Sequence, residues 1–273
     1  MAIHGGHDDA TVILLWTMDD DHKITSPLVW PEIVRKIRER TPARIFVERG
    51  TAYSTRMALE LRSAHASAVD AVWTEFDLQK DLPPEFVARW GLFQVSSRAE
   101  TKSQYLLRPD LGRTLSESAK SLIAQRCSKA PDIQIVIGDG LSSAAVRVQV
   151  PSLFQLLEQR LRVHGWSIGQ SFFVRYARVG IMNDVGDLLS PRVIVLLIGE
   201  RPGLATAESL SAYMAYAPRS GHTDADRNLI SNIHARGVSV EQAVDRIINL
   251  VTQMVALKRS GIALKEENPR LPY

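Results

Sequence analysis

The sequence has little cysteine and no long hydrophobic run. Its single cysteine, Cys127, excludes an intramolecular disulfide and is typical of a protein from a reducing compartment. No apolar run approaches the roughly 20 residues that a membrane-spanning helix needs, so we expect no association with a membrane. A short apolar stretch near the start follows acidic rather than basic residues, which is not the pattern of a secretory signal. We therefore expect a cytoplasmic protein.

Charge of one sign is nowhere concentrated in the sequence. The 33 Lys and Arg residues are interspersed with 30 Asp and Glu residues, and the formal net charge is +3. Nucleic-acid binding would need a basic face, so we expect no nucleic-acid partner. The 45% hydrophobic and 23% charged content is that of a globular protein, and 273 residues suffice for one large domain or two ordinary ones.

Familiar catalytic and metal-binding motifs are missing as well. The sequence has no G-x-G-x-x-G, phosphate-loop lysine, G-x-S-x-G or H-E-x-x-H motif, and no cysteine pair to hold zinc. Cys127 and His65 fall on or beside helical apolar patterns, where packed or partly exposed residues are common. His4, His7 and His22 stand among acids near the start, but nothing fixes a ligand geometry there. We assign no catalytic residue and no metal site.

The first hundred residues predict mainly helices. Residues 1–26 are interpreted as a flexible extension, and residues 27–100 as a mainly helical N-terminal domain. An amphipathic helix is expected over Trp30–Arg40, and a second over Met57–Phe76. The apolar stripe of the second helix consists of Met57, Leu61, Ala64, Ala68 and Val72.

Residues 101–273 alternate between strand and helix patterns. Strands are predicted at Ile133–Ile137, Phe172–Tyr176 and Val193–Ile198 because these runs are short, apolar and rich in β-branched or aromatic residues. Helices are predicted over Leu115–Cys127, over Pro151–His164 with the proline at the first helical position, and from a capping box of Ser239 and Gln242 up to Gly261. This alternation predicts the α/β class, with an open, mainly parallel sheet and flanking helices.

Three loops should meet at one edge of that sheet. They are Gly138–Ser143 with Asp139, Arg175–Val179, and Gly199–Gly203 with Glu200 and Arg201. Ligands of open α/β sheets bind outside the carboxyl ends of the strands. Arginine binds phosphate or carboxylate groups, and carboxylates accept hydrogen bonds from amides or ribose hydroxyls. Each loop alone is more often structural, but together they indicate a site for a polar ligand.

Several longer segments resemble a known family. They are TPARI (41–45), HASAVDAV (65–72), YLLRPDLGRTL (105–115), IQIVIGDGLSSAAV (133–146), FFVRYARV (172–179), VLLIGERPGLATAESLSAY (195–213) and DRNLISNIH (226–234). In this order they resemble the small (light) subunit of ethanolamine ammonia-lyase, an adenosylcobalamin-dependent enzyme, over about residues 41–262.

The resemblance implies a helical N-terminal part followed by a Rossmann-like, cobalamin-contacting domain over residues 101–273. It implies a large-subunit partner that carries the substrate site, in a hetero-oligomer of equal large and small chains, with the cofactor held between them. Cleavage of the cofactor's Co–C bond starts a radical reaction that converts ethanolamine to acetaldehyde and ammonia. The complex would lie in the cytoplasm or inside a bacterial microcompartment.

The family's cofactor contacts fall on Val179, Glu200 and Leu229. Glu200 is also a residue that the strand pattern singled out. Many relatives have cysteine at the position of Leu229, so here the contact would be apolar. The D-x-H-x-x-G motif of base-off cobalamin proteins is absent, which agrees with a family that keeps the cofactor's own base on cobalt.

Two alternatives remain from the residues alone. One is a self-sufficient, nucleotide-binding α/β enzyme that uses Asp139 or Glu200 as its base. The other is a non-catalytic adaptor that docks the lyase into a microcompartment through residues 1–26.

Overall fold

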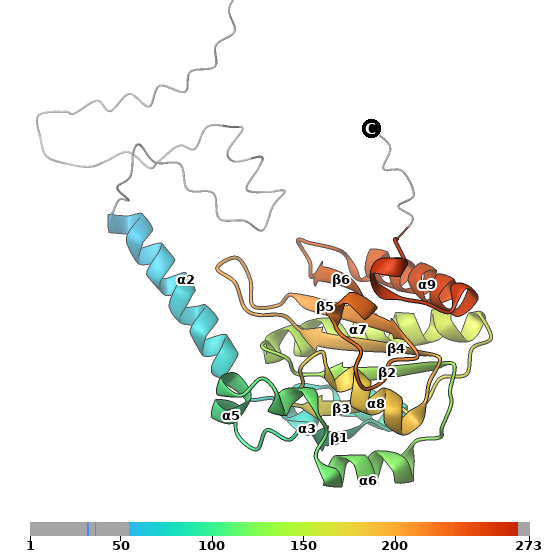
Figure 1. Ribbon diagram of the computed structural model, residues 1–273. Coiled ribbons are helices and arrows are strands. Elements are labelled where there is room, and N and C mark those ends of the chain that lie inside the picture. Colours follow the sequence, from blue (N-terminus) through green and yellow to red (C-terminus); the bar gives the residue numbers. More distant parts are fainter. Residues whose placement is uncertain (1–31, 33–35, 37–54, 267–273) are drawn as a thin grey trace, which may run out of the picture.

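A six-stranded sheet with helices on both faces forms the body of the protein (Figure 1). The computed structural model describes Glu32, Lys36 and residues 55–266. The expected flexible extension of residues 1–26 lies outside the described residues. So does the expected helix over Trp30–Arg40, except for Glu32 and Lys36, which are both helical.

The described elements follow one another along the chain as helices first and then as alternating strands and helices. The helices are α2 Thr55–Trp73, α3 Leu78–Asp81, α4 Pro84–Trp90, α5 Lys102–Leu107, α6 Glu117–Arg126, α7 Ser143–Val163, α8 Ile181–Leu189 and α9 Val240–Leu257. The strands are β1 Phe93–Ser96, β2 Ile133–Gly138, β3 Phe172–Arg175, β4 Val193–Gly199, β5 Leu210–Tyr216 and β6 Asn228–Ile233. Short 3₁₀ turns lie at Leu111–Arg113 (η1), Asp224–Asp226 (η2) and Gly261–Ala263 (η3).

The sheet has the strand order β1-β3-β2-β4-β5-β6 and is mainly parallel. Strands β1, β3, β2 and β4 pair in parallel, whereas β5 and β6 join in antiparallel fashion. The helices α7 and α8 provide the crossovers between parallel strands, as such connections require. The α/β class expected from the sequence is confirmed.

Each face of the sheet has its own apolar core. Alternate residues of β2 point to opposite faces, so Ile133, Ile135 and Ile137 pack with α3, α4, α7 and α9, whereas Val136 packs with α6 and α8. All residues of β2 and β4 are buried, which explains why β4 is a continuous apolar run in the sequence and why β2 is apolar except for Gln134. Packing on both faces holds the strands in place and so fixes the positions of the loops that follow them.

Most of the predicted elements are confirmed. The helices predicted over Met57–Phe76 and Leu115–Cys127 are α2 and α6, and the three predicted strands are β2, β3 and β4. The capping box that begins α9 is present, because the Ser239 hydroxyl accepts from the Gln242 N–H while the Gln242 side chain accepts from the Ser239 N–H. Helix α9 ends at Leu257, and Lys258 follows in a left-handed conformation.

The predicted start of α7 at Pro151 is wrong. The helix begins at Ser143, where the hydroxyl of Ser142 accepts a hydrogen bond from the N–H of Ala145, and Pro151 lies inside it. A side-chain cap satisfies an N–H group that a helix start leaves without a partner. The helix therefore starts after the Ser142 cap, although proline is also favoured at a first helical position.

Three strands were not predicted. Strand β1 lies before residue 101 and yet pairs with β3, and Phe76, Leu82 and Phe86 belong to the same core as the central strands. The division into a helical domain of residues 27–100 and a second domain stays a prediction, as does the Rossmann-like topology.

Helix α2 projects from the body (Figure 1). On its predicted apolar stripe, Ala64 is buried and Leu61, Ala68 and Val72 are half-buried. No helix within the described part of the chain is both long enough and apolar enough to cross a membrane.

Candidate functional site

The three predicted loops do meet at the carboxyl edge of the sheet. One carboxylate oxygen of Asp139, after β2, accepts the N–H of Tyr176 at 2.8 Å, and the other accepts the N–H of Ala177 at 2.9 Å. The N–H of Leu141 donates to the carbonyl of Gly199 at 3.1 Å. Hydrogen bonds thus join the loop after β2 to the loops after β3 and β4.

Asp139 is a buried residue whose carboxylate holds these loops together by hydrogen bonds. Its exposed fraction is 1%, and burial raises the pKa of its carboxyl group to about 6. The N–H groups of Tyr176 and Ala177 and the ammonium of Lys102 act against burial and lower this pKa. Both oxygens already accept backbone N–H groups, so Asp139 does not face a ligand.

The serines of the same loop also have structural partners. Ser142 caps α7, and its hydroxyl donates to the carbonyl of Ala207. The hydroxyl of Ser143 donates to the carbonyl of Thr74 at 2.9 Å. Both serines are fully buried, so this loop holds the site together without lining it.

Glu200 follows β4 and is half-buried. Its Oε2 accepts the hydroxyl of Ser209 at 2.7 Å. Its Oε1 accepts the hydroxyl of Ser211 at 2.6 Å and the backbone N–H of Asn232 at 2.8 Å. This carboxylate therefore binds together the end of β4, the start of β5 and the end of β6.

Val179 and Leu229 lie on the α8 side of the sheet. Val179 precedes α8 and packs against the core beneath this helix. Leu229 on β6 is 44% exposed and lies opposite Tyr213 of β5. Tyr213 packs against the same core as Val179, and its side chain lies within the electrostatic influence of Glu200. Two of the predicted contact residues, Glu200 and Leu229, therefore lie next to Tyr213, and Val179 shares the core on this side of the sheet.

Sequence reasoning missed Tyr213 and the partners of Glu200. Tyr213 is half-buried, and burial raises the pKa of its phenol, with the negative charges of Asp224 and Glu200 acting in the same direction. The signal was the alternation in SLSAY, because Ser209, Ser211 and Tyr213 are two residues apart and share one face of an extended strand.

No described helix covers this face of β5 and β6. The core on the α8 side takes Ala215 and Tyr213 from β5 and no buried residue from β6. The connection between β5 and β6 packs instead along α8, where Asn183 donates to the carbonyl of His222 at 2.8 Å and accepts from Arg227 at 3.0 Å. The result is a partly apolar surface with Glu200 at one end.

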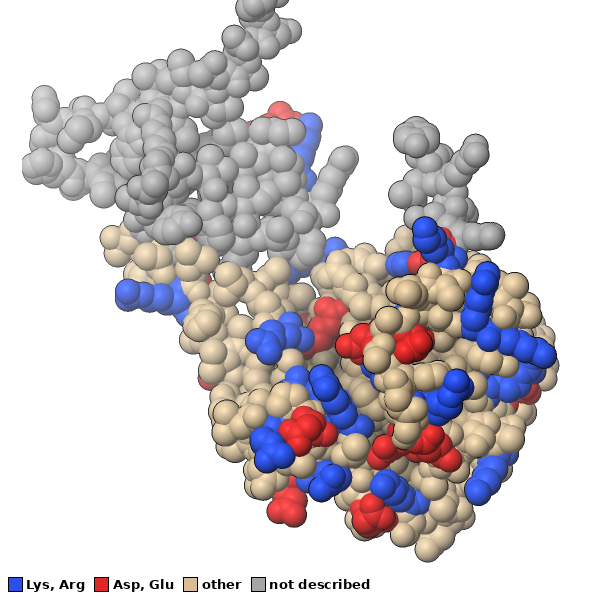
Figure 2. All heavy atoms as spheres, in the orientation of Figure 1, with Lys and Arg blue, Asp and Glu red and all other residues tan. Residues whose placement is uncertain are grey.

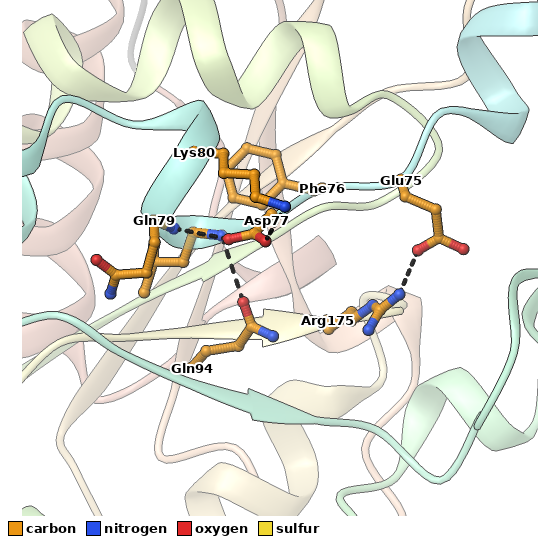
Figure 3. A pocket seen from close by; sticks show the side chains of 8 residues that line it. Glu75, Phe76, Asp77, Gln79, Lys80, Gln94 and Arg175 are labelled. Carbon is orange, nitrogen blue, oxygen red and sulfur yellow. Dashed lines mark hydrogen bonds and ion pairs between the residues drawn. The ribbon is translucent and has the colours of Figure 1, made fainter.

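Arg175 does not belong to this surface. Strands β2 and β4 separate β3 from β5, and the Arg175 guanidinium pairs with Glu75. Figure 3 shows this ion pair beside a surface cavity of about 450 Å³ that is lined by residues 75–80, Gln94 and Arg175. Lys80 in the same cavity pairs with Asp77 at 3.5 Å. Both cations already have carboxylate partners, so the cavity is not an anion site.

The remaining chemical candidates are isolated. Cys127 is buried, and burial raises the pKa of its thiol to about 11, which makes it a poor nucleophile. His65 is exposed on α2. Across the described residues, no group of three or more His, Cys, Asp or Glu side chains could hold a metal ion. The visible face of the molecule mixes basic and acidic side chains (Figure 2).

Comparison with known proteins identifies the family. Residues 31–265 match the model of the family described as ethanolamine ammonia-lyase light chain (EutC). The chain is 41% identical over 235 residues to the ethanolamine ammonia-lyase small subunit of Clostridium perfringens, covering 86% of this chain and 78% of that one. It is 38% identical over 246 residues to the small subunit of Rhodopseudomonas palustris, covering 90% and 94%. The chain therefore belongs to the ethanolamine ammonia-lyase light-chain family.

Proposed function

We propose that this chain is the small subunit of an adenosylcobalamin-dependent ethanolamine ammonia-lyase and covers the cofactor at the interface with a large subunit. The complex converts ethanolamine to acetaldehyde and ammonia, with the substrate site on the large subunit. The observation that carries the proposal is that Glu200 and Leu229 lie next to Tyr213 on a face that no described helix covers, with Val179 in the core on the same side of the sheet.

The residues on this face fit such a cofactor. A corrin ring is broad and apolar, and it carries amide side chains at its rim. Leu229 and Tyr213 offer apolar surface, and the carboxylate of Glu200 accepts N–H or O–H donors. When bound, adenosylcobalamin supplies the radical chemistry at its cobalt–carbon bond. This chain would bind and orient the cofactor and shield it from water.

The partner follows from the relatives, which are named small subunits. We propose a complex of equal numbers of large and small chains. The rival reading as a self-sufficient enzyme with Asp139 as its base is disfavoured, because Asp139 is buried and both of its oxygens accept backbone N–H groups.

The direct test is adenosylcobalamin-dependent release of ammonia from ethanolamine by the large chain alone, by this chain alone and by the two together. We expect activity only from the pair. Turnover by this chain alone would contradict the proposal, and so would an inactive pair in which both chains are folded and associated.

The role of Glu200 can be measured separately. Glu200→Ala removes the acceptor of a charge-assisted hydrogen bond, so the dissociation constant of adenosylcobalamin from the complex should rise about 10- to 100-fold. Glu208→Ala, at an exposed position in the same β4–β5 connection, is the matched control and should bind like wild type. An unchanged dissociation constant for Glu200→Ala would remove this residue from the cofactor site.

A further inference from the structure

The carboxylate of Glu200 is held by uncharged donors. Two serine hydroxyls and one backbone N–H reach its oxygens at 2.6–2.8 Å. Among the described residues, no Lys or Arg forms an ion pair with it. A neighbouring cation would balance the charge of the carboxylate, whereas neutral donors orient the group and leave its charge to act on a ligand.

The antiparallel pairing of β4 and β5 brings these donors into place. Gly199 lies opposite Leu210, and Ile198 lies opposite Ser211. The N–H of Glu200 donates to the carbonyl of Ser209 at 3.0 Å, so the backbone at this point is fixed as well. Ser209 and Ser211 are two residues apart and therefore approach Glu200 from the same face of β5.

Both serines are buried, with exposed fractions of 7% and 3%. A buried hydroxyl without a partner is costly, and in each case the hydroxyl donates to Glu200. The hydroxyl protons are therefore directed at the carboxylate, and rotation of the Glu200 side chain would leave two buried donors without an acceptor.

The number of acceptor positions left for a ligand can be counted. A carboxylate has about four lone-pair positions. Oε1 accepts two hydrogen bonds, from Ser211 and from the N–H of Asn232, and is filled. Oε2 accepts one, from Ser209, and keeps one position.

We infer that Ser209 and Ser211 are positioning residues that fix Glu200 so that its Oε2 presents a single acceptor position to the cofactor. The matching group on the cofactor is one N–H or O–H donor, such as a side-chain amide or a hydroxyl. This inference rests on the proposed role of Glu200 in cofactor binding.

A double-mutant cycle tests the inference in the assembled complex of large and small chains. The dissociation constant of adenosylcobalamin is measured by equilibrium dialysis for wild type, Ser209→Ala, Ser211→Ala and Glu200→Ala, and for each serine variant combined with Glu200→Ala. In the presence of Glu200, each serine substitution should weaken binding about 3- to 10-fold. In the Glu200→Ala background the same substitutions should have no further effect, because nothing remains to be positioned.

The outcomes separate the inference from the proposed function. If Glu200→Ala weakens binding but the serine variants bind like wild type, the positioning role is overturned and the cofactor contact stands. If the serine variants weaken binding equally in both backgrounds, their effect does not pass through Glu200 and the inference is also overturned. If Glu200→Ala binds like wild type, the cofactor contact itself fails, and the inference fails with it.

Two further variants exclude a general effect of losing a buried serine. Ser97→Ala removes a buried hydroxyl that accepts the N–H of Ala99 beyond β1, and it should leave cofactor binding unchanged. Ser209→Thr keeps a hydroxyl donor and should bind close to wild type, whereas weakening equal to that of Ser209→Ala would contradict the hydrogen-bonding role.

Discussion

At the scale of single residues, Asp139 should make the stability of the fold depend on pH, because its carboxyl group is buried among backbone donors. Burial raises its pKa to about 6, above the ordinary 3.8. Between about pH 4 and pH 6 the folded chain therefore holds a proton that the unfolded chain has released. The stability from this proton is fully present below about pH 4 and is lost as the pH rises through 6.

Asp139→Asn has no carboxyl group to titrate and isolates this effect. The free energy of unfolding of wild type minus that of the variant should fall by about 2 kcal/mol between pH 4 and pH 7. Urea unfolding of both proteins across this range measures the difference. A difference that stays flat, or that grows with pH, would show that the carboxyl group is not destabilised by burial.

Some residues of the candidate site could be predicted from the sequence and others could not. Glu200 stood out because it directly follows a buried apolar run, at the end of a strand where ligands bind. Its serine partners could not be inferred in the same way, because they reach Glu200 only when β5 returns antiparallel to β4. Arg175 shows the converse: the sequence placed it at the right edge of the sheet but could not show that Glu75 pairs with it.

At the scale of elements, the loops after β2 and β4 approach so closely that a side chain between them is excluded. Gly140 has a φ of +58°, and a Cβ atom there would lie 2.1 Å from the carbonyl oxygen of Gly199. Gly140→Ala should therefore lower the free energy of unfolding by about 3 kcal/mol or more through overpacking and backbone strain.

Gly203→Ala is the matched control in the neighbouring loop. A Cβ atom at Gly203 would meet nothing within 4 Å, so this variant should stay within about 0.5 kcal/mol of wild type. Denaturant unfolding measures the free energy of unfolding of both variants and of wild type. Equal stabilities would show that the two loops are less closely packed than described.

The elements that the sequence revealed are those with a single dominant signal. Strands β2 and β4 are buried on both sides and read as apolar runs. Strand β1 has only four residues and exposes Gln94, and β6 exposes half of its residues, so neither forms a recognisable run. At the start of α7, the sequence offers two possible first turns, one at Pro151 and one after Ser142. The helix begins after Ser142, which caps it.

At the scale of the whole molecule, the uncovered face of β5 and β6 is where we propose that the cofactor and the large subunit bind. Leu229 is 44% exposed, so Leu229→Lys should leave the stability of the isolated chain within about 0.5 kcal/mol of wild type. If the proposed cofactor site is correct, the same substitution would place a charge against the apolar surface of the cofactor in the complex, and the dissociation constant of adenosylcobalamin should rise at least about tenfold.

Leu257→Lys provides the control for that experiment. Leu257 is 50% exposed at the end of α9, which covers the opposite face of the sheet. It should change neither stability nor cofactor affinity. If both variants weakened cofactor binding alike, the effect would come from charge in general and the proposed face would lose its support.

The hydrogen bond between Glu200 and Asn232 has one more consequence. Asn232 is an exposed residue of β6, a strand at the edge of the sheet, where backbone amides ordinarily exchange hydrogen for deuterium readily. Its N–H instead donates to the carboxylate of Glu200, in the loop after β4. Deuterium uptake at this one amide therefore follows how long the Glu200 side chain stays in place, and the protein carries its own built-in probe of the candidate site.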